Sequence, residues 1–402
     1  MADIVELTRQ RRASERDAPA APAWSKLVIP RDPMLLLLTD IDASEWHALV
    51  DRAIEPNAYY LPDWELAVNA SAPGRTGACA LAAWSEARLI GLMPVTSIRQ
   101  AYKIPLPALV SAHPYGTLCT PTLDGACAES AASQLMQAAR TAGARAIVMR
   151  EVALDGAAMK AFTDALQRDG LAPRILNSHV RASLDATGDA EQLLHDALGA
   201  KKLKELRRQR HRLAEQGALS LEVACSPQEV SVAIETFLAL EASGWKGKRG
   251  TALVQVKGDA AFIRRATRAL AEGGRCQIVT LRAGATPVAS GIVLRHLSRA
   301  FFFKLGVDEQ FAKFSPGVQL TLELTRHLCA DPEITSVDST ASPDHPMINP
   351  IWRGRFAIGD VLVPLRRNDP LVAMIHAALI ARQFARKTAR RAVRVARNLK
   401  SR

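Results

Sequence analysis

Hydrophobic and polar positions alternate along the second half of the chain in a pattern that predicts a fixed series of strands and helices. Runs with period two predict strands at 219–224, 276–283, 287–296, 299–306 and 334–338. Apolar residues three or four positions apart predict helices at 227–243 and 259–272, and another that begins at Ser315-Pro316-Gly317. A last strand is expected at the segment FAIGDVLVPL. The predicted order is a strand, two helices, three antiparallel strands, a helix and a strand.

The first half repeats part of this plan. Residues 78–98 have the pattern of two β runs joined by a short polar turn, and residues 275–294 show the same arrangement. Each hairpin follows a helical region and precedes further strand-like and helical segments, so we expect an α/β protein with two tandem units. The predicted boundaries are a flexible N-terminal tail at 1–30, a first unit at 31–187, a second unit at 188–366 and a basic C-terminal tail at 367–402.

The composition excludes several classes of protein. The chain has 402 residues, enough for two or three domains, and no apolar run approaches the roughly 20 residues of a spanning helix. Its first thirty residues lack the apolar centre of a signal peptide, which predicts a cytoplasmic location. The six cysteines are scattered, and the motifs H-E-x-x-H, G-x-S-x-G and G-x-x-x-x-G-K-[ST] do not occur. The sequence therefore predicts no metal site and argues against zinc hydrolases, serine esterases and P-loop NTPases.

Positive charge is concentrated at the C-terminus. The net charge is +12, and residues 382–402 hold nine Lys or Arg and no acid, which leaves +3 for residues 1–381. The preceding apolar residues recur at roughly helical spacing: Leu371, Ile375, Ala378, Leu379 and Phe384. This pattern predicts a basic amphipathic helix that attaches to the anionic inner face of a membrane. The alternative is a solvated basic tail, or one loosely bound to nucleic acid.

A second basic cluster occupies 200–213, on a helical pattern that carries Leu203, Leu206 and Leu213. Either its cations form a solvated face, or they contact an anion or lipid phosphate. Few aromatic residues accompany the cluster, so it gives little support to base stacking, and we expect no nucleic-acid partner.

The joint at Ser315-Pro316-Gly317 suits an anion. Ser315 is a natural N-cap, Pro316 suits the first helical position, and Gly317 allows a close approach. Such a helix start presents free N–H groups at the positive end of the helix dipole. A phosphate could therefore bind there.

Four segments carry a resemblance to a known family: KKLKELRRQRHRLAEQG, LEASGWKGKRGTAL, FFFKLGVDEQFAKFSPGVQL and VDSTASPDHPMINPIWRGR. They resemble the GNAT-type acetyltransferase domain of the cellulose-biosynthesis (CelD/BcsL) group, which is related to the Fem-type peptidyltransferases with two GNAT units. The resemblance is strong over about 195–365 and is one of layout over 31–187. It implies tandem GNAT-like domains, each a mixed, mostly antiparallel sheet flanked by helices.

The resemblance also implies acyl-CoA as co-substrate. In the GNAT fold the segment between the fourth strand and the next helix cradles the pyrophosphate, and here that segment is Phe314, Ser315, Pro316, Gly317 and Val318. The usual loop is R/Q-x-x-G-x-G/A, whereas KFSPGV offers one glycine and a proline. Fewer N–H groups therefore face the ligand, and we expect a reduced or reshaped cradle.

Acyl transfer to an amine needs a base, donors for the oxyanion and a proton for the leaving thiolate. The candidate catalytic residues are Asp338 at the end of a strand, His345 in the turn that follows, and Glu241. Each has a structural alternative: Asp338 can cap the turn, His345 can bond backbone, and Glu241 can be a helix-surface charge.

The thiolate needs its own proton donor, often a tyrosine in GNAT enzymes. All four tyrosines lie in the first half, at 59, 60, 102 and 115. Either water or another residue protonates the thiolate, or the site draws on both halves.

Candidate acceptor-binding residues lie in two segments. They are Trp245, Lys246 and Arg249 in a glycine-containing basic loop, and Lys304 and Asp308 around the end of an aromatic strand. A Lys–Asp or Lys–Glu pair there could orient a substrate, although a helix-ending turn and a solvent-facing lysine are equally ordinary.

Three functions remain open. The leading one is a GNAT-family acyltransferase that moves an acetyl or acyl group from acyl-CoA to an amine or hydroxyl acceptor, in envelope polysaccharide biosynthesis. A second is a Fem-like transferase that takes its acyl group from charged tRNA and contacts the RNA through residues 200–212. A third is a non-catalytic, membrane-associated accessory protein of the same fold. The acceptor and the oligomeric state do not follow from the sequence.

Overall fold

The computed structural model describes residues 32–113 and 115–400, so the predicted tail at 1–30 lies outside the described residues. The first half contains the strands β1 (Met34–Leu37), β2 (Cys79–Ser85), β3 (Arg88–Ser97), β4 (Ala108–Ser111), β5 (Thr122–Leu123), β6 (Ala146–Ala153) and β7 (Arg174–Asp185). Its helices are η2 (Leu38–Asp40), α2 (Ala43–Val50), η3 (Ala58–Tyr60), α3 (Pro62–Ser71), α4 (Ile98–Tyr102), α5 (Ala128–Thr141) and α6 (Ala157–Arg168).

The second half contains the strands β8 (Leu219–Ala224), β9 (Cys276–Ala283), β10 (Thr286–His296), β11 (Arg299–Val307), β12 (Ser336–Asp338) and β13 (Gly354–Pro364). Its helices are α7 (Ala190–Ala214), α8 (Pro227–Ser243), α9 (Trp245–Lys248), η4 (Leu253–Gln255), α10 (Lys257–Glu272), η5 (Glu309–Phe314), α11 (Pro316–Cys329) and α12 (Pro370–Lys400). The series of elements predicted for 219–338 is confirmed, with bounds that shift by two residues or fewer. The antiparallel pairing of β9, β10 and β11 is confirmed as well.

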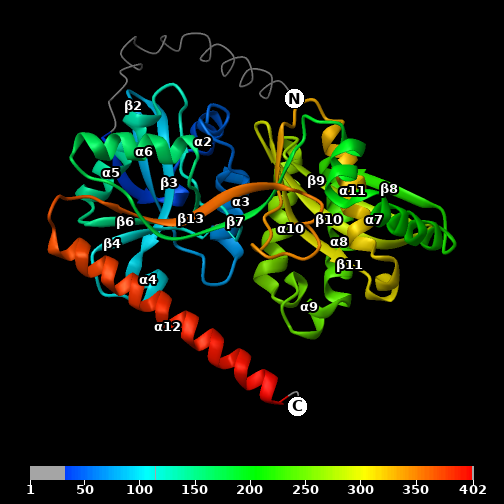
Figure 1. Ribbon diagram of the computed structural model, residues 1–402. Helices are drawn as coiled ribbons and strands as arrows, with labels where there is room; N and C mark the ends of the chain where they lie inside the picture. The colour runs from blue at the N-terminus through cyan, green and yellow to red at the C-terminus, as the bar shows by residue number, and fades with distance from the viewer. Residues whose placement is uncertain (1–31, 114, 401–402) are drawn as a thin grey trace, which may run out of the picture.

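The described strands form one mixed sheet in the order β1-β2-β3-β4-β6-β13-β7-β12-β11-β10-β9-β8, with β5 beside β3. Each half contains one parallel pair, β4 with β6 in the first and β11 with β12 in the second. The two halves thus repeat one plan, and they lie side by side with helices around the sheet (Figure 1).

The halves exchange their last strands. Strand β7 ends the first half of the sequence, yet it pairs with β12 of the second half. Strand β13 ends the second half and pairs with β6 of the first. The two exchanged strands also pair with each other at the centre of the sheet. The boundary at 187/188 stays a prediction, because the hydrogen bonding of the sheet runs across it.

One hydrophobic core fills the junction between the halves. It includes Tyr59 and Trp64 from the first half and Phe262 and Phe301 from the second. The rings of Trp64 and Phe262 meet edge to face, with centroids 5.0 Å apart, a geometry that favours aromatic pairs by about 0.5–1.5 kcal/mol beyond burial. Helix α3 accordingly packs against α10.

His296 makes hydrogen bonds across the same junction. Its Nδ1 accepts the backbone N–H of Asn57 at 2.8 Å, and its Nε2 lies 2.9 Å from the carbonyl oxygen of Val50. The ring is therefore neutral, with the proton on Nε2. Burial lowers the pKa of His296 to about 4, although the bond to Val50 opposes this shift.

Acid should weaken the contribution of His296 to stability. The imidazole returns to a pKa of about 6.5 in the unfolded chain, so between pH 6.5 and 4 the unfolded state binds a proton that the folded state does not. Stability therefore falls as the pH falls through this window. We expect a loss of about 3 kcal/mol from this residue. Urea unfolding at several pH values should show a shallower acid loss in His296→Gln than in the parent; equal slopes would contradict this role.

The C-terminal helix is real, but part of its apolar face is used inside the protein. Ile375 and Leu379 are buried with Val372 against Ile98 and Val110 of the first half. The prediction that Ile375 and Leu379 face a membrane is therefore wrong. Exposed apolar residues remain at Met374, Ile380 and Phe384. In the described part of the chain, no helix is both long and apolar enough to cross a bilayer.

Candidate active site

Strand β11 has an open edge where it leaves its parallel partner. Pairing with β12 ends at Phe301 and Asp338, whereas pairing with β10 continues to Val307. The pairing with β10 also shifts register between Ile292 and Val293, which places Phe303 in a bulge. The edge of β11 at 302–307 therefore has no strand partner on the β12 side; we call the space between β11 and the chain after β12 the gap.

The start of α11 lies beside this open edge. Ser315 occupies the N-cap position, but it has left-handed backbone (φ 55°, ψ 51°) and its side chain makes no capping bond. The predicted N-cap position of Ser315 is confirmed, although its side chain does not cap the helix. With no side-chain cap, the first N–H groups of α11 are available to an anion.

Gly317 is buried rather than exposed. A Cβ there would meet Leu305 at 3.1 Å, Val307 at 3.2 Å and Met347 at 3.3 Å. The glycine therefore allows α11 to pack closely on β11 and the turn after β12. Phe314 and Pro316 are buried as well, and Val318 is half-buried. In the reshaped cradle predicted from KFSPGV, backbone N–H groups could bind a phosphate, but Gly317 itself offers no exposed surface to it.

Helix α7 brings cations to the start of α11. Gln319 Nε2 donates to the carbonyl of Leu206 at 2.9 Å, and Arg210 pairs with Glu323 at 2.7 Å. Contacts that advance four residues on both helices show that the helices run parallel. Helix α7 breaks at Gly199 (φ 72°, ψ 161°), so its second segment begins at the same end as α11.

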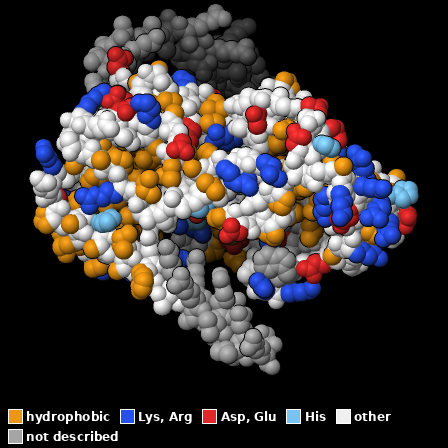
Figure 2. Space-filling model, in the orientation of Figure 1, with side chains coloured by type: hydrophobic (Ala, Val, Ile, Leu, Met, Phe, Trp, Pro, Cys, Tyr) orange, Lys and Arg blue, Asp and Glu red, His pale blue; other side chains and the backbone are white. Residues whose placement is uncertain are grey.

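The exposed cations at this end are Lys201, Lys202 and Lys204. The predicted arrangement of the 200–213 cluster is confirmed, because Leu203, Leu206 and Leu213 are buried and the basic side chains between them are mostly exposed. Figure 2 shows Lys and Arg gathered on the side of the molecule that α7 forms. Two aligned helix starts and three lysines make this end attractive to phosphate.

A buried polar cluster closes the other end of the gap. Asp338 forms a two-point ion pair with Arg181 of β7, with Nε to Oδ1 at 2.7 Å and a second contact from Nη2 to Oδ2. Thr340, whose backbone is left-handed (φ 51°), donates its hydroxyl to the carbonyl of Phe302 at 2.7 Å. Arg181 also donates to the carbonyl of Thr117 at 2.7 Å.

The hydroxyl of Tyr59 lies in this cluster, beside Thr117 and Thr340. It is fully buried, and neither it nor the Thr117 hydroxyl makes a hydrogen bond of ordinary geometry. Burial and the carboxylate of Asp338 raise the pKa of Tyr59, so it stays protonated at neutral pH. A buried hydroxyl without a partner is costly and indicates a group that a ligand can satisfy. The first-half tyrosine thus reaches the second half.

The predicted bases Asp338 and His345 are held by structural bonds. The pairing of Asp338 with Arg181 favours a positioning role, and its part in proton transfer stays a prediction. His345 Nδ1 lies 3.4 Å from the backbone N–H groups of Met347 and Ile348, so it caps a turn. Burial lowers the pKa of His345, which leaves it neutral.

Glu241 and two of the predicted substrate-binding lysines do come together. Glu241 is buried, not a surface charge, and its Oε1 lies 2.8 Å from Lys246 Nζ and 3.6 Å from Lys304 Nζ. Its Oε2 accepts the N–H of Leu253 at 2.9 Å. Burial would raise the pKa of Glu241, but the two lysines outweigh it and hold the pKa below its usual value. This cluster lies along β11 and α8 at the mouth of the gap.

Other predicted residues lie apart from this pair. Asp308 does not pair with Lys304; its carboxylate accepts the N–H of Gln310 at 2.9 Å and caps η5. Arg249 is exposed in the turn after α9, and the side chain of Trp245 lies outside the described part. Among the described residues, no group of His, Cys, Asp or Glu side chains could hold a metal ion.

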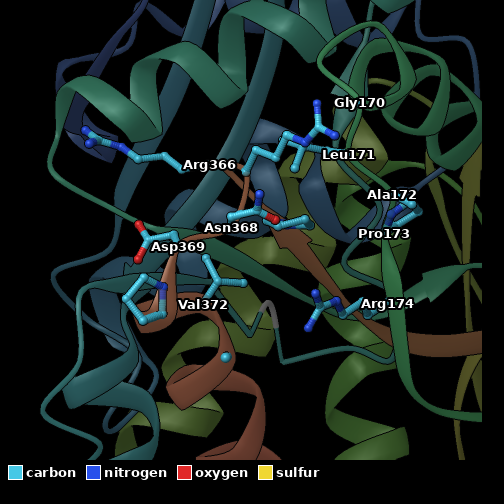
Figure 3. Close-up of a pocket in the computed structure, with 13 residues that line it drawn as sticks. Gly170, Leu171, Ala172, Pro173, Arg174, Arg366, Asn368, Asp369 and Val372 are labelled. Atoms are coloured by element: carbon cyan, nitrogen blue, oxygen red, sulfur yellow. The ribbon is translucent and has the colours of Figure 1, made fainter.

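Figure 3 shows a hollow of about 450 Å³ between the turn before β7 and the turn before α12. Gly170, Arg174 and Asp369 are among its lining residues, and none of the lining residues belongs to β11, β12 or α11. Asp369 is already paired with Arg145 at 3.1 Å. This hollow is therefore separate from the gap.

Comparison with solved structures shows the fold. The crystal structure of FemX is 12% identical, with 84% of this chain and 98% of FemX covered, at a TM-score of 0.54. The C-terminal domain of a putative lysylphosphatidylglycerol synthetase from Agrobacterium fabrum is 16% identical, with 84% and 95% covered, at 0.52. A conserved protein of unknown function from Bacteroides thetaiotaomicron is 10% identical, with 82% and 100% covered, at 0.50.

The mixed sheet with its surrounding helices confirms the predicted α/β class, and these likenesses show a fold shared with the three proteins. More particularly, residues 200–345 match the family described as the acetyltransferase (GNAT) domain. No curated protein matches the chain in sequence. The gap beside β11, the start of α11 and most of the second-half polar residues described above lie within the matched range.

Proposed function

We propose that the chain is a GNAT-type acyltransferase that moves an acyl group from acyl-CoA to an amine or hydroxyl acceptor. One observation carries this proposal: the open edge of β11 at 302–307 lies beside the uncapped start of α11. A thioester arm can bond to free strand groups, and its pyrophosphate can bind helix N–H groups. Lys201, Lys202 and Lys204 add positive charge for the same phosphates.

Tyr59 is the residue that we propose protonates the leaving thiolate. Its hydroxyl is protonated, unpartnered and close to Thr340, which bonds the edge of β11. The Arg181–Asp338 pair holds the surrounding backbone in place. The acceptor would enter at the Glu241, Lys246 and Lys304 cluster, where the ionised Glu241 can orient an amine or hydroxyl group.

The resemblance to the cellulose-biosynthesis group supports an acceptor from an envelope polysaccharide. The alternative is a Fem-like transferase that uses charged tRNA, and the cationic face of α7 favours it because RNA phosphates would suit that face. Calorimetry with acetyl-CoA separates the two. Micromolar binding to the full chain supports the first function, whereas no binding to acetyl-CoA together with salt-sensitive binding to charged tRNA supports the second.

We also propose that α12 attaches the protein to an anionic membrane surface from the cytoplasmic side. Met374 and Phe384 are 54% and 73% exposed, they lie on one side of the helix with Ile380, and nine Lys or Arg follow from 382 onward. Each cation near such a surface contributes about 1 kcal/mol. The attachment should be mainly electrostatic and weaken as salt screens it.

Vesicle co-sedimentation tests this attachment. The truncation should remove 385–402 and keep Val372, Ile375 and Leu379, because these three residues belong to the core of the first half. We expect the full chain to sediment with anionic but not neutral vesicles at low salt, and the truncated chain to stay in the supernatant. Phe384→Ser is a milder variant that should weaken binding without changing charge. Equal recovery of full-length and truncated protein in the supernatant would contradict the proposal.

A further inference from the structure

Two arginines of the first half face one small cavity. The cavity measures about 170 Å³, and its lining includes Arg75, Thr96, Gln100, His113 and Arg150. A water occupies about 30 Å³ of liquid volume, so the space corresponds to roughly five or six waters. Arg75 and Arg150 are both half-buried, and the cavity is large enough for a phosphate or a diphosphate group.

The two arginines have no anionic partner on the described chain. Neither makes an ion pair within 4.0 Å among the described side chains, and the Nε of Arg75 is buried without a hydrogen bond. Glu65 and Asp259 lie near Arg75. Burial raises the pKa of Glu65 well above its usual value and keeps it neutral, and Asp259 accepts the hydroxyl of Tyr115 rather than pairing with Arg75. Arg150 also lines a neighbouring hollow together with Glu151 and Asp360, and these carboxylates help to raise its pKa; neither pairs with it within 4.0 Å, and neither lines this cavity. Half-buried cations are normally paired, so an external anion is the missing partner.

Aromatic contacts hold the arginines in place instead. The guanidinium of Arg75 lies over the ring of Tyr115, 5.1 Å from its centroid, and that of Arg150 lies 5.9 Å from the Tyr102 centroid. The Nδ1 of His113 accepts the N–H of Tyr115 at 3.1 Å. Burial and the two arginines lower the pKa of His113 to about 3, so its ring is neutral and adds no charge. Stacking orients a guanidinium but does not neutralise it. The donors therefore remain free to form two-point contacts to phosphate oxygens.

The cavity lies at the first-half counterpart of the gap beside β11. Strand β4 separates from β6 after Val110 and Val148, and Arg150 follows on β6. Tyr115, which stacks on Arg75, donates its hydroxyl to Asp259 of α10 at 2.7 Å. Tyr115 thus links Arg75, which lines the cavity, to the second half.

We infer that this cavity binds a phosphate group carried by the acceptor substrate, held by Arg75 and Arg150. The assignment of the phosphate to the acceptor rests on the proposed function, whereas the phosphate site itself rests on the two unpaired arginines. The acceptor would then be a phosphorylated or diphosphate-linked molecule rather than a neutral sugar or amine.

Titration calorimetry with inorganic pyrophosphate tests the site. Because the start of α11 could also take pyrophosphate, the titrations use a Ser315→Asp background, which places a carboxylate there. We expect Arg75→Gln and Arg150→Gln each to weaken the remaining binding at least tenfold, since each loses a charged two-point donor. Arg99→Gln is the matched control: it removes the same charge from exposed α4 and should leave the affinity unchanged. No saturable binding to the Ser315→Asp protein, or an unchanged affinity in both cavity variants, would overturn the site.

Two further titrations locate the phosphate and its chemistry. Acetyl-CoA should bind Arg150→Gln as it binds the parent; a parallel loss would place the donor's own phosphates in the cavity and overturn the assignment to the acceptor. Succinate should bind more weakly than pyrophosphate; equal, arginine-dependent binding would overturn the phosphate class. If acetyl-CoA binds neither protein while pyrophosphate still needs both arginines, the proposed function fails and the phosphate site stands. Thermal unfolding shows that each variant is folded.

Discussion

Asp338→Asn is expected to lower the free energy of unfolding by about 3–5 kcal/mol, the range for breaking a buried ion pair by removing one partner. Arg181 and Asp338 have side chains that are 1% and 0% exposed, so the variant leaves the guanidinium without its counter-charge. The pair also joins β7 to the end of β12, on opposite sides of the predicted boundary between the units.

Denaturant unfolding measures this loss, and a double variant provides the control. Arg181→Met combined with Asp338→Leu removes both charges and should lose less stability than Asp338→Asn alone, because no charge stays buried and unpaired. If Asp338→Asn unfolds within about 1 kcal/mol of the parent, the pair does not stabilise the junction.

Tyr59→Phe is expected to lower turnover by about 10²–10³-fold, within the range for loss of a general acid, with acetyl-CoA affinity unchanged. Stability should stay near the parent value, because the buried hydroxyl that the variant removes makes no hydrogen bond of ordinary geometry with its neighbours Thr117 and Thr340. If Tyr59 had only a structural role, its loss would not lower turnover while stability stayed unchanged. The release of CoA thiol with an acceptor found by screening measures turnover.

Tyr60→Phe is the matched control for this variant. The Tyr60 side chain is equally buried, but its hydroxyl donates to the carbonyl of Ala112 at 2.7 Å. Its loss should therefore cost about 1–3 kcal/mol of stability and leave turnover unchanged. Parent-like turnover in Tyr59→Phe would remove Tyr59 from the mechanism.

The order of elements was predictable because it depends on local patterns. Helix α8 shows this most clearly: Ser226 caps it, Glu229 completes a capping box and Pro227 takes the first turn, and its bounds are those predicted. Strands β9 to β11 follow in the same way from period-two runs and short turns. Local chemistry of this kind is readable without knowledge of the tertiary structure.

Long-range pairing was not predictable from such patterns. Arg181 and Asp338 are 157 positions apart, and the signal for Arg181 is an arginine between Val180 and Ala182 in a strand. That pattern indicates a possible buried charge but does not name its partner. The exchange of β7 and β13 was unpredictable for the same reason, because the local pattern of a strand does not specify the half with which it pairs. Candidate bases near 338–345 were therefore placed correctly along the chain and given roles that their bonds do not favour.

Residues with free backbone groups were easier to locate than catalytic side chains. The helix start at Ser315 was predicted as an anion site from capping rules, and the structure provides the free N–H groups through the left-handed backbone of Ser315 rather than through Gly317. The role proposed for Tyr59 could be approached only through the lack of any tyrosine in the second half, because tertiary packing brings its hydroxyl beside Thr340.

Calorimetric titration of acetyl-CoA into the parent, Ser315→Asp and Ser315→Asn tests the central claim most directly. Asp and Asn both tolerate a left-handed backbone, so both variants should fold, but only Asp places a negative charge where the pyrophosphate should bind. The proposed site predicts micromolar binding to the parent, similar binding to Ser315→Asn, and affinity at least about tenfold weaker for Ser315→Asp. Equal affinity for all three proteins, or no binding to the parent, would contradict an acyl-CoA site between β11 and α11.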